Sequence, residues 1–152
     1  MKTVQCGNVS ETEAVGRELA KAIDGAGIRS AVIAMFGEMG VGKTAFTRGF
    51  SSYFGIPGVK SPTYTVVNEY RGGGTSVFHF DMYRIEGEDD LYSIGFDDYL
   101  AKPGYCIIEW SENIREFLPD GYIAVTVSRT DGADGRKIGI SLPDGLKEKV
   151  IL

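Results

Sequence analysis

The feature that most constrains the fold of this chain is the segment from Gly37 to Thr44, which has the pattern G-x-x-x-x-G-K-T. The apolar run Ala31 to Phe36 precedes it, and the helix-compatible run Ala45 to Phe54 follows it and stops at Gly55. A strand, a glycine-rich loop and a helix in this order expose backbone N–H groups and a helix N-terminus to an anion. The pattern predicts a phosphate-binding loop, against the alternative of a glycine-rich turn that binds nothing.

The motif also predicts which groups contact a nucleotide. We expect Lys43 to reach the β- and γ-phosphates and to act in catalysis, and Thr44 to place its hydroxyl on Mg²⁺. We expect ATP or ADP as the nucleotide, because the chain contains no N-K-x-D segment of the kind that reads guanine. The residues expected to surround the phosphates are Glu38, Met39, Gly40, Val41, Gly42, Lys43 and Thr44.

The length and composition are those of one compact domain. The chain has 152 residues, of which 43% are hydrophobic and 24% charged, so we expect residues 1–152 to form a single P-loop ATPase domain. The net charge of −5 argues against this chain alone holding a nucleic-acid backbone, which requires clustered Lys and Arg. The two cysteines make no disulfide framework, and no membrane-length apolar stretch or secretory signal is present. We therefore expect a cytoplasmic protein that does not contact the membrane.

The rest of the sequence predicts an α/β fold with a mixed, mostly parallel sheet flanked by helices. Ser10 and Glu13 fit a capping box for a helix over Glu11 to Ile23. The runs Thr63 to Tyr70 and Thr75 to Asp81, separated by a glycine-rich turn, predict an antiparallel hairpin. The other predicted elements are a short helix over Glu86 to Ile94 and strands over Tyr105 to Glu109, Tyr122 to Ser128 and Ile138 to Leu142.

Two carboxylates follow apolar strands and are candidates for a metal site. Asp81 ends the run Val77 to Phe80, and Glu109 ends the run Cys106 to Ile108. Nucleotide hydrolases place an acidic residue at the end of a buried strand near the phosphate loop, where a carboxylate is unfavourable without a cation. We assign Glu109 to Mg²⁺, directly or through water, and Asp81 to the attacking water or a second metal contact; the two roles could be exchanged. Either residue taken alone could also be an exposed strand end or a helix cap.

Three further features lie close to these candidates in the sequence. The segment Ser61 to Thr65 follows the phosphate-loop helix, where nucleotide switches carry a hydroxyl that senses the γ-phosphate, although spacing alone favours an ordinary turn. His79 is the only histidine, and its aromatic neighbours favour packing over catalysis. Trp110 is a candidate either to pack over the nucleotide site or to contact a partner.

Five segments between Gly37 and Trp110 occur in a characteristic order: GEMGVGKTAFTRGF, SPTYTVVNEY, FHFDMYR, GFDDYL and IIEW. Together they closely resemble the TsaE family, also called YjeE, small bacterial ATPases needed for the threonylcarbamoyladenosine modification of tRNA. The glycine-rich loop is shared with many other proteins, whereas SPTYT, FDMYR and IEW are much more specific. One departure is Ala45, because the family usually carries Thr at that position.

The resemblance implies a P-loop NTPase fold and a weak intrinsic ATPase that acts with TsaD and TsaB, so that tRNA is held only indirectly through these partners. It also implies that Ser61 to Thr65 forms a mobile, switch-like loop, with the hydroxyls of Ser61, Thr63 and Thr65 as candidates. The residues that match the family's functional positions are Lys43, Thr44, Asp81, Glu109 and, near the nucleotide base, Arg136.

Two functions of other classes compete with this reading. A small-molecule kinase would close an arginine-rich lid over the transferred phosphoryl group, whereas Arg71, Arg84 and Arg115 are scattered here. A nucleotide-dependent binding module without turnover would bind ATP tightly and keep its partner after loss of Asp81. Because no arginine finger is evident in the sequence, we expect slow hydrolysis by the isolated chain.

Overall fold

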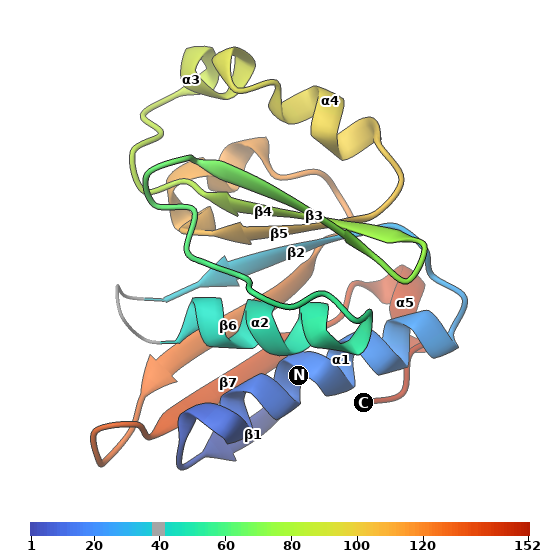
Figure 1. The fold of residues 1–152 in the computed structure, drawn as a ribbon, viewed down its shortest axis with the longest axis vertical. Coiled ribbons are helices and arrows are strands. Elements are labelled where there is room, and N and C mark those ends of the chain that lie inside the picture. Colours follow the sequence, from blue (N-terminus) through green and yellow to red (C-terminus); the bar gives the residue numbers. More distant parts are fainter. Residues whose placement is uncertain (38–41) are drawn as a thin grey trace.

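The computed structural model describes residues 1–37 and 42–152, which form a single sheet with helices packed on it (Figure 1). The strands are β1 (Lys2–Cys6), β2 (Ala31–Phe36), β3 (Val67–Gly72), β4 (Thr75–Asp81), β5 (Tyr105–Glu109), β6 (Ile123–Arg129) and β7 (Arg136–Ser141). The helices are α1 (Val9–Gly25), α2 (Lys43–Tyr53), α3 (Glu88–Ser93), α4 (Phe96–Ala101), α5 (Asp144–Lys147) and the 3₁₀ helix η1 (Ser111–Phe117).

The strand order of the sheet is β1-β7-β6-β2-β5-β4-β3. Strand β2 lies between β6 and β5 and is parallel to both, and β4 is parallel to β5. The edges are antiparallel: β3 forms a hairpin with β4, and β7 pairs antiparallel with both β6 and β1. Strands β1, β6, β2, β5 and β4 therefore run in one direction, which confirms the predicted mixed, mostly parallel sheet with its antiparallel hairpin.

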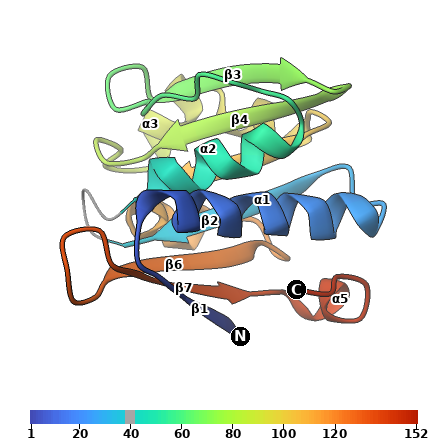
Figure 2. The same ribbon diagram turned by 60° about the horizontal axis from the view of Figure 1, so that its bottom comes forward.

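Helices cover both faces of the sheet. Helices α1 and α2 lie side by side across one face, while α3, α4 and η1 lie on the other side (Figure 2). Strand β5, next to the central strand β2, is accordingly buried on both faces, as expected for a parallel strand between two helical layers. Tyr105 and Ile107 contribute to the apolar cluster beneath α1 and α2, whereas Cys106 and Ile108 contribute to the cluster on the opposite face.

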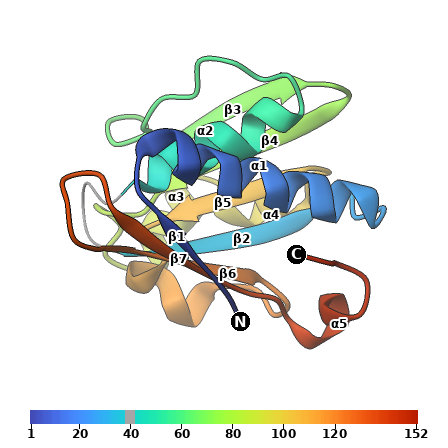
Figure 3. The ribbon, with the colours of Figure 1, turned by 90° about the horizontal axis from the view of Figure 1, so that it is seen from below.

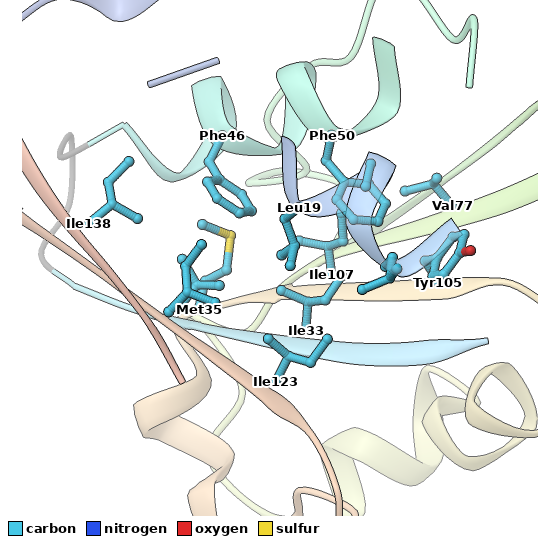
Figure 4. Close-up of a cluster of buried hydrophobic side chains, with 14 of the residues drawn as sticks. Leu19, Ile33, Met35, Phe46, Phe50, Val77, Tyr105, Ile107, Ile123 and Ile138 are labelled. Carbon is cyan, nitrogen blue, oxygen red and sulfur yellow. The ribbon is translucent and has the colours of Figure 1, made fainter. Parts of the chain in front are cut away.

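The larger apolar cluster fills the space between α1, α2 and the sheet (Figure 4). Phe46 and Phe50 of α2 and Leu19 of α1 are fully buried against side chains from the central strands. The rings of Phe50 and Tyr105 meet edge to face, with centroids 5.3 Å apart at an interplanar angle of 76°. This packing fixes α2 against β2 and β5, and so fixes where the N-terminus of α2 lies.

Two glycines allow α1 and α2 to approach closely. A Cβ atom added to Gly49 would lie 1.8 Å from the carbonyl oxygen of Glu13, and one added to Gly16 would lie 2.1 Å from the carbonyl oxygen of Phe46. Real side chains do not tolerate such distances, so each glycine is required by the backbone of the facing helix. The contact between the two helices therefore depends on small residues on both sides.

The sequence predicted most of these elements but misplaced the start of α1. The predicted capping box at Ser10 and Glu13 is wrong, because the N-cap is Asn8. The Asn8 Oδ1 atom accepts a hydrogen bond of 2.9 Å from the Glu11 amide, and the Glu11 carboxylate accepts one of 2.9 Å from the Gly7 amide. A cap at Asn8 leaves Glu11 at the third helical position, where its charge favours the helix dipole. Strand β1, helices α4 and α5 and the 3₁₀ helix η1 were not predicted, and the first strand of the hairpin, β3, begins at Val67 rather than at Thr63.

The two ends of the chain lie near one another, close to the edge of the sheet formed by β1 and β7 (Figure 3). Strand β1 is the edge strand there, and its residues are largely exposed apart from Cys6. Within the described ranges, no helix combines the length and apolar content that crossing a membrane requires.

Candidate functional site

The two candidate carboxylates lie side by side at one end of the sheet. Asp81 and Glu109 are directly opposite each other in the parallel pairing of β4 and β5. Because side chains alternate along a strand, Glu109 shares its face with Ile107, and Asp81 shares its face with His79. Only 7% of Asp81 and 5% of Glu109 is exposed, so both carboxylates are in a site that favours a bound cation. Neither residue is a solvated strand end, which removes that alternative interpretation.

Lys43, the first residue of α2, is buried beside these carboxylates. Its Nζ atom donates a hydrogen bond of 2.7 Å to the carbonyl oxygen of Gly37, directly after β2. The same Nζ atom lies 4.1 Å from the ring centroid of Trp110, so the tryptophan covers the lysine. The α2 N-cap, Gly42, adopts a left-handed backbone with φ of 99°, which glycine accommodates without strain.

Burial lowers the pKa of Lys43 below its ordinary value of 10.5, because the charged amine is removed from water. The carboxylates of Glu109, Glu112 and Asp81 oppose this effect by stabilising the charge. The net direction is downward, so burial is the larger influence. An anionic ligand next to Lys43 would, like these carboxylates, stabilise the charged form of its amine.

Thr44 connects the helix to Glu109. Its hydroxyl donates a hydrogen bond of 3.1 Å to Oε2 of Glu109, although the two residues are 65 positions apart in sequence. The same Oε2 atom contacts Nε2 of His79. A threonine hydroxyl that donates to a carboxylate keeps its oxygen lone pairs available, which suits it to coordinate a metal.

Asp81 has different partners. Its Oδ1 atom accepts a hydrogen bond of 2.9 Å from the amide of Tyr83, and its Oδ2 atom accepts one of 3.2 Å from the Thr63 hydroxyl. The Thr63 hydroxyl also lies 2.6 Å from that of Ser61. The segment predicted as a switch loop is therefore attached to the site through Asp81. Thr65 is not, because its hydroxyl donates to Asn68.

These residues enclose a cleft of about 540 Å³. Its rim includes Arg84, whose guanidinium carbon lies 5.6 Å from the ring centroid of Tyr64, and both of these side chains are exposed. The side chains that line the cleft come from four separate parts of the chain. The lining residues are Gly42, Lys43, Thr44, Ser61, Thr63, Asp81, Tyr83, Arg84, Glu109 and Trp110.

A larger hollow of about 680 Å³ lies elsewhere, between α1, β1 and the C-terminal residues. Its lining includes Val4, Val15, Leu19 and Ile151, and it is predominantly apolar. It contains none of the candidate residues, so size alone does not identify the functional site. The chemistry of the lining favours the smaller cleft.

The structure places the predicted site residues as follows. Lys43, Thr44, Asp81 and Glu109 come together in the cleft, and Gly42 lies at its wall. Arg136 begins β7, and its Nε atom lies 3.7 Å from the point that a Cβ atom on Gly42 would occupy. The predicted phosphate-loop residues Glu38, Met39, Gly40 and Val41 lie outside the described residues.

Further residues in or beside the site, among them Tyr83 in its lining, were not assigned a functional role from sequence. His79 contacts Glu109, and its place two residues before Asp81 on the same strand was a signal that it shares that face. Arg84 lies on the rim, close to Asp81 in the FDMYR segment. Glu112 accepts a hydrogen bond of 3.0 Å from the amide of Gly37, and no local pattern indicated this contact across 75 positions of sequence.

Comparison with known proteins identifies the family. Residues 6–138 match the sequence profile described as "Threonylcarbamoyl adenosine biosynthesis protein TsaE". A Haemophilus influenzae protein named tRNA threonylcarbamoyladenosine biosynthesis protein TsaE is 37% identical over 124 residues, which cover 81% of this chain and 77% of that protein. The Bacillus subtilis protein of the same name is 39% identical over 108 residues, which cover 70% of this chain and 66% of that protein.

The fold agrees with this relationship. The crystal structure of Bacillus subtilis YdiB superposes with a TM-score of 0.75 at 28% sequence identity, covering 97% of this chain and 88% of YdiB. The predicted P-loop NTPase fold is thereby confirmed, with β2, α2 and the adjacent parallel strands in their expected relation. Sequence and fold together show that the chain belongs to the TsaE family.

Proposed function

We propose that this chain is a Mg²⁺-dependent ATPase that acts in the biosynthesis of threonylcarbamoyladenosine in tRNA, as a single P-loop domain over residues 1–152. The names of the relatives from Haemophilus influenzae and Bacillus subtilis support the pathway. The sequence motif G-x-x-x-x-G-K-T supports the nucleotide chemistry. A cytoplasmic location is part of the same proposal and agrees with the two free, buried cysteines.

The observation that carries the proposal is the convergence of four side chains on one cleft. Lys43 and Thr44 come from the start of α2, and Asp81 and Glu109 come from the ends of adjacent parallel strands. A lysine, a hydroxyl and two carboxylates at this place are the groups that a P-loop NTPase uses for the phosphates, the metal and the water. In a turn that binds no ligand, the burial of two carboxylates beside a lysine would cost free energy without compensation from a bound ion or phosphate.

The residues present fit a Mg²⁺ ion bound together with a nucleotide. Mg²⁺ is usually held by one or two protein oxygens plus water and phosphate oxygens, rather than by a cage of protein ligands. This matches the described residues, which contain no group of three or more His, Cys, Asp or Glu arranged to hold a metal. Thr44 and Glu109 would hold the ion, and the bound ion would neutralise charge on the phosphates.

The roles of the two carboxylates follow from their partners. Glu109 is hydrogen-bonded to Thr44, which supports its assignment to the metal, directly or through water. Asp81 is hydrogen-bonded to Thr63 of the segment between α2 and β3, which supports a role in orienting the attacking water. Lys43 would stabilise the charge that develops as the bond between the β- and γ-phosphates breaks.

We expect hydrolysis by the isolated chain to be slow. Among the described residues that line the cleft, Lys43 and Arg84 carry positive charge, and Arg84 is exposed on the rim. A partner that orders the Ser61 to Thr65 segment or supplies a further positive group would accelerate the reaction. We propose TsaD and TsaB homologues as these partners, with tRNA bound through them, because the net charge of −5 does not favour tRNA binding by this chain.

The test is ATP hydrolysis by the chain alone and with purified TsaD and TsaB homologues from the same organism, each with and without Mg²⁺. We expect slow hydrolysis alone and strong stimulation by the partners, and loss of both in Lys43→Ala. Turnover near 10 s⁻¹ by the isolated chain, a typical enzyme rate, would contradict the proposal. Phosphoryl transfer to a metabolite would favour the kinase interpretation, and tight ATP binding without turnover would favour the binding module.

A further inference from the structure

His79 is a buried titratable residue to which the proposed mechanism gives no role. It is the only histidine of the chain, it lies in the middle of β4, and its side chain is fully buried. Its Nε2 atom contacts Oε2 of Glu109 on the neighbouring strand. The two residues are diagonal neighbours, because Ile107 is opposite His79 and Asp81 is opposite Glu109 in the strand pairing.

The contact indicates which nitrogen carries a proton. An ionised carboxylate only accepts hydrogen bonds, so Nε2 of His79 must be the donor to Glu109. Among the described residues, the other ring nitrogen, Nδ1, has no hydrogen-bond partner. An unpartnered buried acceptor is more easily tolerated than an unpartnered N–H group. The ring with hydrogen on Nε2 and a bare Nδ1 is therefore the form that fits this site.

The same Oε2 atom of Glu109 also accepts the hydroxyl hydrogen of Thr44, at 3.1 Å. Two donors on one oxygen fix the rotation of the carboxylate, since a turn about its last torsion would break both bonds. Thr44 in turn is held with its hydroxyl hydrogen directed to Glu109 and its lone pairs directed elsewhere. The orientation of Thr44 and of Glu109 therefore depends on the histidine behind them.

We propose that His79 is a positioning residue: its Nε2–H group orients the Glu109 carboxylate, and through it the Thr44 hydroxyl, for Mg²⁺ that arrives with the nucleotide. The inference rests on the proposed nucleotide site. It concerns a residue that does not line the cleft and so does not touch the ligand itself. Residues of this kind typically change metal affinity by roughly 10- to 100-fold when they are replaced.

The first test concerns the hydrogen bond and needs no ligand. The protein has one histidine, so a two-bond ¹H–¹⁵N correlation spectrum of the ring shows a single, unambiguous pattern. We expect a proton on Nε2 and none on Nδ1. A ring without a proton on Nε2 could not donate to Glu109 and would overturn the proposal.

The second test measures the affinity for ADP by calorimetry, with and without Mg²⁺, and takes the ratio of the two dissociation constants. His79→Leu removes the donor, and His79→Gln keeps an N–H group near the position of Nε2. We expect His79→Leu to reduce the Mg²⁺-dependent gain in affinity by roughly 10-fold or more, and His79→Gln to restore most of it. The affinity without Mg²⁺ should change much less.

A matched control separates positioning from simple packing. Val77 lies on the same strand and face, is fully buried and belongs to the apolar cluster, so Val77→Ala disturbs the sheet without touching Glu109. It should keep the Mg²⁺-dependent gain. Equal losses in Val77→Ala and His79→Leu, or no loss in His79→Leu, would overturn the role of His79. A wild-type protein that binds no ADP would overturn both the proposed function and this inference. The hydrogen bond from His79 to Glu109 is tested separately, because the ¹H–¹⁵N spectrum needs no ligand.

Discussion

One face of the sheet carries two regions of opposite character beneath a single helix. Under the middle of α2, Phe46 and Phe50 belong to the apolar cluster that also contains Met35, Tyr105 and Ile107 of the strands. Under the first turn of α2, Lys43 lies against the carboxylates at the ends of the neighbouring strands. A few residues along the same strands therefore separate an apolar interior from a charged cleft.

The apolar interior determines where the groups of the cleft lie. The groups that line the cleft come from the helix N-terminus, two strand ends and a loop, which are far apart in the sequence. The packing of α2 on β2 and β5 sets the relative positions of these groups. The apolar side chains of the interior determine this packing, and Gly16 and Gly49 allow α1 to lie close to α2. We therefore expect changes in the interior to alter stability, and changes in the cleft to alter chemistry.

The largest effect is expected from Phe50→Ala. The ring is fully buried between α2 and Tyr105, so its removal should lower the free energy of unfolding by about 3–5 kcal/mol through lost burial and a cavity. Urea denaturation of the two proteins gives this difference. A loss below about 1 kcal/mol would mean that the interior does not hold α2 as we infer.

Lys43→Met tests most directly whether the chemistry of the cleft can be lost while the fold of the interior is kept. The substitution keeps an unbranched side chain that is one atom shorter and removes the charged amine, so we expect ATP hydrolysis to fall by about 100-fold or more. Burial lowers the pKa of Lys43 and so disfavours its charge, whereas the variant loses the hydrogen bond to the Gly37 carbonyl, so we expect the free energy of unfolding to change by less than about 1.5 kcal/mol. Hydrolysis at the wild-type rate would refute the role of the lysine. A clear loss of stability would show instead that the charge supports the fold.

Glu109→Gln and Asp81→Asn form a matched pair within the cleft, since each keeps the size of the side chain and removes one charge. We expect Glu109→Gln to weaken Mg²⁺-dependent ADP binding by roughly 10-fold or more, because Glu109 is the partner of Thr44. Asp81→Asn should mainly lower turnover. The measurements are ADP affinity against Mg²⁺ concentration and single-turnover hydrolysis. If Glu109→Gln mainly lowered turnover and Asp81→Asn mainly weakened Mg²⁺-dependent binding, Asp81 would hold the metal and Glu109 would orient the water.

The smallest effect on stability is expected from Arg84→Ala, at the rim of the cleft. The side chain is exposed and its contact is the ring of Tyr64, so the free energy of unfolding should change by less than about 0.5 kcal/mol. Thermal and urea denaturation measure this change in stability, and Phe50→Ala, measured in parallel, serves as the variant with a large expected loss. A loss comparable to that of Phe50→Ala would mean that the rim, like the interior, holds the fold together.

Local patterns in the sequence determined much of this protein. The glycine-rich motif between an apolar run and a helix placed Lys43 and Thr44, because strand, loop and helix are contiguous in the chain. The bounds of β4 and β5 were predicted because apolar runs end there in Asp81 and Glu109. The start of α1 was misplaced since two residues of capping type, Asn8 and Ser10, compete locally and only the backbone geometry selects the first.

Only the tertiary structure decided which of these groups meet. The bond from Thr44 to Glu109 spans 65 positions, and the contact between His79 and Glu109 spans 30. The alternation of side chains along a strand is enough to place His79 and Asp81 on one face. It does not show that the strand bearing Glu109 lies next to them in a register that aligns the carboxylates. Strand order and register result from the packing of the whole sheet beneath its helices, which no local pattern of residues contains.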